Sequence, residues 1–208
     1  MILKRRALLG FGPSDDHHIT ILNRMIDMVV ENGENTILYK PDPRHVDLLV
    51  KQFGLNDLRA KGVGTPGEKK GDYHDEEPLS KSDGTLYRSG TMRLAYLAED
   101  LANVKFCGNR AARSMSSPTR GAWNRLKRAV RYLKDHPRWV QRFVEQEFVK
   151  TIDCFTDSDW ASDIKDRKSV SCIVVMIGRN TIKVQVSTQT APALSSGEAE
   201  YVANVKGG

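Results

Sequence analysis

The first forty residues carry an apolar pattern that is compatible with two structures. A helical spacing joins the apolar residues Ile19, Leu22, Met25, Ile26 and Val29. Alternation at Ile19 and Ile21, followed by the β-rich segment 36–39, instead fits a hairpin that turns at Asn32 and Gly33. The pattern by itself leaves both alternatives open.

Helical periodicity is clear from residue 42 onward. Asp42 can cap a first helix, Pro43 suits its first turn, and Gly54 ends it. Apolar spacing predicts two further helices over 86–97 and 104–115. Ser117 and Pro118 then predict the cap and first position of a fourth helix, which His136-Pro137 stops. Its buried stripe is Trp123, Leu126, Val130 and Leu133.

The pattern changes to strands at residue 139. We expect strands over 140–148, 152–157, 170–177 and 182–186, with a hairpin turn at 178–180. A last helix is predicted over 194–205. Helices followed by a β-meander and one helix indicate a mixed α/β fold of the α+β type.

The segment 61–84 differs from its neighbours in composition. It is rich in Gly, Lys, Glu, Asp and Pro and has almost no apolar residues. Such a segment has too little apolar surface to fold by burial, so we expect a flexible linker.

Composition narrows the class of protein. A length of 208 residues indicates one or two domains, and no apolar run approaches the ~18 residues of a membrane span. The three cysteines, Cys107, Cys154 and Cys172, form no metal-ligand spacing. This sparse use of cysteine favours a reduced, intracellular location, cytoplasmic or nuclear, without a membrane partner.

Positive charge is concentrated in one segment. Residues 110–138 hold nine basic residues and one acid, a charge of +8, so the rest of the +6 chain sums to −2. A basic block within a near-neutral chain is typical of proteins that bind polyanions. Our candidates for phosphate contacts, projecting away from the apolar stripe of the fourth helix, are Arg125, Arg128, Arg131 and Lys134.

Two carboxylates are the candidates for catalysis. Asp157 lies at the end of a predicted strand, where its side chain can reach solvent and a metal ion. Ser195 and Glu198 match a capping box, which gives Glu198 a structural role. Glu200 lies roughly 200° further round the helix and has no such role, so capping logic nominates Glu200 as the free carboxylate.

Three successive motifs surround these carboxylates. They read Thr-Asp-Ser-Asp-Trp-Ala at 156–161, Asp-Arg-Lys-Ser at 166–169 and Ala-Leu-Ser-Ser-Gly-Glu-Ala-Glu-Tyr at 193–201. In order and spacing they resemble the ribonuclease H domain of copia-type retrotransposon polyproteins. Segments 86–89, 115–119 and 126–134 are similar to the connection before that domain, and 42–54 with 65–67 to the end of reverse transcriptase. The resemblance covers nearly the whole chain.

The resemblance implies a domain order. Residues 1–60 would be the C-terminal end of the reverse transcriptase region, 61–84 a linker, 85–138 a basic helical connection and 139–208 a ribonuclease H-like β-meander plus helix. The thumb and connection helices would thus precede an incomplete ribonuclease H-like domain. The polymerase motif is absent, since Asp15 and Asp16 lack the preceding aromatic residue.

The resemblance also implies a chemistry. The family domain cleaves the RNA strand of RNA–DNA hybrids with two Mg²⁺ ions held by four carboxylates. Asp157 matches the first metal ligand and Glu200 the second, while the third and fourth would lie beyond Gly208. We therefore expect these 208 residues to be close to inactive alone, and the strand ending at Asp157 to be an exposed sheet edge. The alternatives are a non-catalytic nucleic-acid-binding module and a transposon remnant without function.

Overall fold

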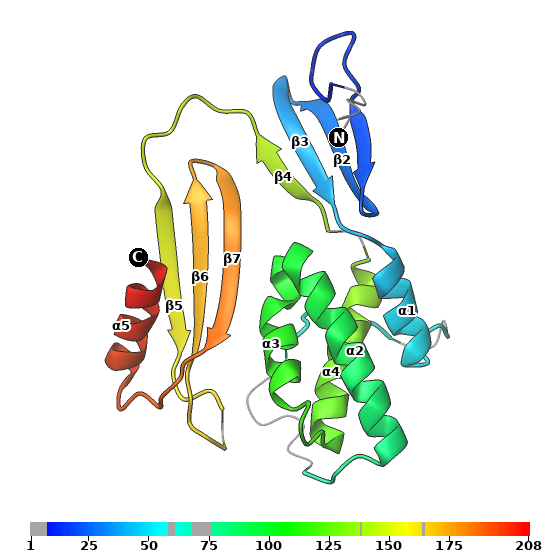
Figure 1. Ribbon diagram of the computed structural model, residues 1–208, viewed down its shortest axis with the longest axis vertical. Helices are drawn as coiled ribbons and strands as arrows, with labels where there is room; N and C mark the ends of the chain where they lie inside the picture. The colour runs from blue at the N-terminus through cyan, green and yellow to red at the C-terminus, as the bar shows by residue number, and fades with distance from the viewer. Residues whose placement is uncertain (1–7, 58–60, 68–75, 138, 164) are drawn as a thin grey trace, which may run out of the picture.

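A computed structural model of the protein describes residues 8–57, 61–67, 76–137, 139–163 and 165–208. The structure contains a four-stranded sheet that lies above a group of helices in Figure 1. A three-stranded sheet, covered by one helix, lies beside them. The mixed α+β fold predicted from the sequence is confirmed. In the described part of the chain, no helix has the length and apolar character required to cross a membrane.

The hairpin alternative is correct for the N-terminal segment. β1 (His18–Ile21), β2 (Arg24–Glu31) and β3 (Glu34–Lys40) pair antiparallel in succession. Asn32 and Gly33 both have positive φ, at 54° and 80°. A two-residue turn of this kind matches the twist of paired strands, which explains why the turn chemistry prevailed over the helical spacing.

The strand predicted over 140–148 is shorter and has an unexpected partner. β4 (Gln141–Val144) pairs antiparallel with β3 and completes the first sheet, in the order β1-β2-β3-β4. Residues more than a hundred positions apart thus meet, as with Thr36 and Val144. The alternation of apolar residues identifies a strand but carries no information about its partner.

The helical unit contains α1 (Arg44–Gln52), α2 (Lys81–Asp100), α3 (Lys105–Arg113) and α4 (Arg120–Asp135), with a short 3₁₀ helix η1 (Ala102–Val104). Gly54, with φ of 63°, follows the end of α1 as predicted.

Two of the predicted boundaries are wrong. The linker does not extend to residue 84, because the hydroxyl of Ser80 accepts the amide of Asp83 at 3.1 Å and starts α2 at Lys81. Part of that linker, 68–75, lies outside the described residues. The cap of α4 is Thr119 rather than Ser117, since the Thr119 hydroxyl accepts the amide of Ala122 at 3.3 Å.

The four helices enclose the largest apolar core. Leu49, Tyr87, Leu94, Val104 and Leu126 are its fully buried centre. The Tyr87 hydroxyl donates to the Ala111 carbonyl at 2.8 Å, so even its one polar group is satisfied. Trp123 packs against the same cluster, and the apolar stripe predicted for α4 is confirmed.

The C-terminal unit consists of β5 (Asp153–Asp159), β6 (Val170–Ile177), β7 (Asn180–Thr188) and α5 (Ser196–Gly207). The strands form an antiparallel meander in the order β5-β6-β7, and Gly178 makes the β6–β7 turn with φ of 55°. Within the described residues β5 pairs with β6 alone, so it has the open edge that was expected. α5 packs along β5 on one face of this sheet (Figure 1).

Candidate functional site

Glu200 is held against the strand that carries Asp157. Its Oε1 accepts the backbone N–H of Ser158 at 3.1 Å, and that N–H belongs to the peptide bond between Asp157 and Ser158. The expectation that Glu200 would be free of a local role is therefore wrong. It satisfies a donor at the open edge of β5, where no strand of the described chain supplies an acceptor.

The Asp157 side chain lies on the other face of the sheet. Its neighbours Thr156 and Ser158 face α5, because their side chains contact Asn204 and Gln189 respectively. Side chains alternate along a strand, so Asp157 lies on the face opposite α5. It is exposed and pairs in register with Cys172 on β6. Burial, aided by the charge of Asp157, raises the pKa of the Cys172 thiol.

The capping box predicted at the start of α5 is present, with one shift in its second bond. The Ser195 hydroxyl accepts the amide of Glu198 at 3.1 Å. The Glu198 carboxylate accepts the backbone N–H of Leu194 at 2.6 Å, whereas the capping box predicts the N–H of Ser195 as the donor. Glu198 is thus used for folding, as the sequence indicated.

Sequence reasoning missed Gln189, whose side chain contacts both carboxylate-bearing elements, β5 and α5. Its side-chain amide donates to the carbonyl of Ala199 at 2.8 Å and to the hydroxyl of Ser171 at 3.0 Å. A polar residue directly after a strand usually lies in a turn. No local pattern could have shown that Gln189 is 6% exposed and tied to three elements.

Asp157 and Glu200 are the metal ligands expected from the sequence, and the structure brings the Glu200 carboxylate to the amide that follows Asp157. Among the described residues, no group of three or more His, Cys, Asp or Glu side chains is arranged to hold a metal ion. Mg²⁺ is commonly bound through one or two carboxylates, with water and substrate phosphates completing its shell.

The basic side chains of α4 are less exposed than the sequence suggested. Arg125, Arg128, Arg131 and Lys134 are all half-buried. Arg131 Nε donates to the carbonyl of Lys61 at 2.6 Å and Lys134 Nζ to the carbonyl of Asp57 at 2.8 Å. Arg128 binds the Gly67 carbonyl and the Thr65 hydroxyl.

The reason lies in the polar segment that runs beside α4. Residues 57 and 61–67 form no helix or strand, so their carbonyl groups need donors from elsewhere. Long basic side chains supply them, and their stems cover apolar surface. Part of the positive charge of α4 thus serves folding rather than a surface for phosphate.

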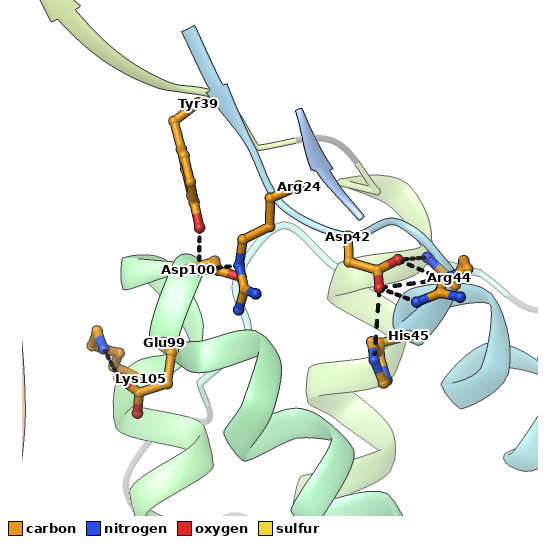
Figure 2. Close-up of polar contacts among 8 residues, drawn as sticks. All are labelled: Arg24, Tyr39, Asp42, Arg44, His45, Glu99, Asp100 and Lys105. Atoms are coloured by element: carbon orange, nitrogen blue, oxygen red, sulfur yellow. Dashed lines mark hydrogen bonds and ion pairs between the residues drawn. The ribbon is translucent and has the colours of Figure 1, made fainter. Parts of the chain in front are cut away.

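A second polar cluster joins the first sheet to the helices (Figure 2). The Asp100 carboxylate at the end of α2 accepts Arg24 Nε at 2.9 Å and the Tyr39 hydroxyl at 2.8 Å. Burial and the bond to Asp100 raise the pKa of Tyr39 to about 12. Nearby, Arg44 binds the buried Asp42, and the bonds from Arg44 hold the pKa of that carboxyl below its usual value. Asp100 is thus engaged with Arg24 and Tyr39, and Asp42 separately with Arg44, which indicates a structural joint.

Comparison with known proteins gives the lineage of the chain. It is 33% and 31% identical, over 156 residues, to the retrovirus-related Pol polyproteins from transposons RE2 and RE1 of Arabidopsis thaliana. It is also 24% identical over 164 residues to an uncharacterized mitochondrial protein of the same plant, covering 79% of this chain and 67% of that protein. The chain is a homologue of retrotransposon Pol polyproteins.

Only a small part of each Pol polyprotein corresponds to this chain. The similarity covers 75% of the chain and 10% of each of the two polyproteins. No family model matches the sequence, and no solved structure gives a significant match. The Pol relationship therefore rests on sequence similarity, and the activity of the intact polyproteins extends to this chain only as a proposal.

Proposed function

We propose that this chain is a segment of a copia-type Pol polyprotein that connects the end of reverse transcriptase to ribonuclease H. In this proposal it contributes the first two metal ligands of a site that hydrolyses RNA in RNA–DNA hybrids. The observation that carries the proposal is the bond from Glu200 to the Asp157–Ser158 amide. It brings the Glu200 carboxylate to the backbone N–H that directly follows Asp157, 43 positions earlier in the sequence.

In this proposal the two carboxylates have complementary roles. Glu200 has one oxygen committed to Ser158, and in the described residues its Oε2 accepts no hydrogen bond. That bond fixes the orientation of the carboxylate and leaves Oε2 for a cation. Asp157 is exposed and can bind the cation from the opposite side of the strand. Asp157 and Glu200 would thus hold a Mg²⁺ ion at the edge of β5.

A bound Mg²⁺ would supply activation of water and stabilisation of the leaving oxygen. Two carboxylates leave most of the coordination positions of two Mg²⁺ ions without a protein ligand. We therefore expect the 208-residue protein to bind metal weakly and to cleave hybrids at a rate near background. Efficient hydrolysis would require further ligands in addition to Asp157 and Glu200.

The test combines metal binding with hybrid cleavage. Mn²⁺ added to the isotope-labelled protein should broaden NMR signals of residues 157–158 and 198–201 first, and Asp157→Asn or Glu200→Gln should suppress this. Asp153→Asn, which removes an exposed acid from the same strand, is the control. Equal broadening in all variants would refute the metal site, and rapid cleavage by the wild-type chain that Asp157→Asn abolishes would refute its incompleteness.

A nucleic-acid-binding module is the second candidate. The +8 charge of residues 110–138 favours it, although part of that charge is engaged with Asp57 and residues 61–67. Binding through phosphates predicts that log affinity for a hybrid falls linearly with log salt. Charge reversal at Arg125, Arg128 and Arg131 should flatten that dependence. No binding at low salt would exclude the module and leave a remnant without function.

A further inference from the structure

Gln189 follows β7, and its side chain contacts three elements of the C-terminal unit. Its Nε2 lies 2.8 Å from the Ala199 carbonyl, 3.0 Å from the Ser171 hydroxyl and 3.4 Å from the Ser158 hydroxyl. An amide has two hydrogens, so the two shorter contacts are the main bonds. The backbone N–H of Gln189 donates to the Ser169 carbonyl at 2.9 Å, which fixes its position beside β6.

The partners of Gln189 lie on the elements that carry the candidate site. Ala199 immediately precedes Glu200 on α5, and Ser158 immediately follows Asp157 on β5. Ser171 pairs in register with Ser158, on the adjacent strand β6. One side chain therefore connects the helix turn of Glu200 to the strand position of Asp157.

The rest of the α5 interface is made by small side chains. Ala199 and Ala203 are fully buried, and Gly207 lies so close to β5 that a Cβ there would come 2.7 Å from Thr156. Small residues let α5 approach the sheet closely. Their side chains interlock little with the strands, so they do not fix the rotation of the helix about its axis. The polar contacts of Asn204 and Gly207 with Thr156 and Cys154 hold the C-terminal end of α5. Gln189 holds the N-terminal end, where Glu200 lies.

The cost of burying Gln189 supports a specific role. Its Oε1 is buried and makes no hydrogen bond within the described residues. An unpaired buried acceptor is destabilising, so a residue of this kind is not explained by core packing alone. Turning the amide over would set Oε1 against the Ala199 carbonyl, so the observed orientation is the one that the surroundings permit.

We propose that Gln189 is a positioning residue that sets Glu200 on the Asp157–Ser158 amide. It acts through Ala199 and through Ser171, which pairs in register with Ser158, and does not itself contact the metal or the nucleic acid. The positioning is a property of the folded chain, whereas its effect on metal binding rests on the proposed function of Asp157 and Glu200.

The experiment replaces Gln189 with methionine, which has a similar volume and no amide. Gln185→Met is the matched control, because Gln185 lies on β7 and its side chain makes no hydrogen bond within the described residues. The first measurement is hydrogen exchange of the Ser158 amide by NMR. We expect Gln189→Met to accelerate this exchange about tenfold or more, toward the value in Glu200→Ala, with Gln185→Met unchanged.

A second variant and a second measurement separate the possible outcomes. Ser171→Ala removes one acceptor of the Gln189 amide, and we expect it to accelerate Ser158 exchange by a smaller factor even if Gln189→Met unfolds α5. Unchanged Ser158 exchange in both variants would overturn the positioning role. Faster exchange combined with no Mn²⁺ broadening at residues 157–158 in the wild type would uphold the positioning role and refute the metal function instead.

Discussion

The helical unit and the C-terminal unit bury their side chains in different ways. Large apolar residues such as Leu94, Leu126 and Tyr87 fill the core between α1 and α4. The interior between β5–β7 and α5 contains Ile173 and two alanines, with Ser171 and Gln189 among them. One interior is held by apolar area, and the other by small residues and hydrogen bonds.

The two units also differ in the apolar surface that they expose. On the C-terminal unit, Phe155, Tyr201 and Val205 are each more than half exposed. Burial of apolar area contributes about 25 cal/mol per Å², so side chains that stay in water contribute little. From this difference in buried apolar area we infer that the stability of the chain is concentrated in the helices. The candidate site belongs to the less stable unit.

The largest effect is expected from cutting the helical core. Leu126→Ala should lower the free energy of unfolding by about 2–5 kcal/mol, because it leaves a cavity that rigid neighbours cannot fill. Ile173→Ala in the C-terminal unit should lie at the lower end of that range, since surface residues there can move inward. Urea denaturation followed by circular dichroism measures both.

Leu86→Ala is the control, because Leu86 is exposed on the same helix bundle. Its effect should stay within about 0.5 kcal/mol. A greater loss for Ile173→Ala than for Leu126→Ala would invert the comparison between the two units.

The next effect concerns Asp42, which is 1% exposed and bound by Arg44 (Figure 2). Asp42→Asn should destabilise the joint by about 1.5–3 kcal/mol near neutral pH, because it weakens charge-assisted hydrogen bonds. The folded pKa of Asp42 is lowered, chiefly by the bond from Arg44. Its stabilisation is therefore complete above the unfolded pKa of ~3.9 and is lost as pH falls through the folded value.

Thermal unfolding between neutral pH and strong acid checks this sign. The difference in stability between wild type and Asp42→Asn should shrink as the pH falls below about 4. A difference that grows toward acid would contradict the assignment. Asp47→Asn, on the first turn of α1, is the control for loss of charge alone.

A smaller effect tests the half-buried arginines of α4. Arg128→Gln with Arg131→Gln should release residues 61–67, because three hydrogen bonds to that segment disappear. We expect a cost of about 1–2 kcal/mol for opening the segment and faster proteolysis within it. Lys127→Gln is the control, because it removes one positive charge from the same helix and none of these bonds. Equal proteolysis of the wild type, the double variant and Lys127→Gln would contradict the structural role of these arginines and favour phosphate binding.

The smallest effect concerns the cap of α5. Ser195→Ala removes the hydroxyl that accepts the Glu198 amide and should cost about 1 kcal/mol, confined to α5. Hydrogen exchange of the first amides of α5 should accelerate, while those of α4 stay unchanged. Ser196→Ala is the neighbouring control. Acceleration in α4 as well would show that the two units unfold together.

Local chemistry decided much of what could be predicted. The Asn32-Gly33 turn, the stop at Gly54, the apolar stripe of α4 and the capping box at Ser195 each depend on residues within a few positions of one another. Such features act before the chain is folded, so the sequence contains them directly. The boundaries at Ser80 and Thr119 were missed because several neighbouring residues could serve as caps.

Tertiary structure decided the rest. Residue order along the chain was sufficient to predict the turns and the apolar helix faces. It also nominated Asp157 and Glu200 as candidate site residues. Three features are visible only in the folded chain. β4 pairs with β3, and the α4 arginines contact residues 61–67. Gln189 is buried between Ser171 and Ala199. The physical reason is that unpaired backbone groups and buried amides take partners from whatever lies nearby in space, and spatial proximity is not written in any local pattern.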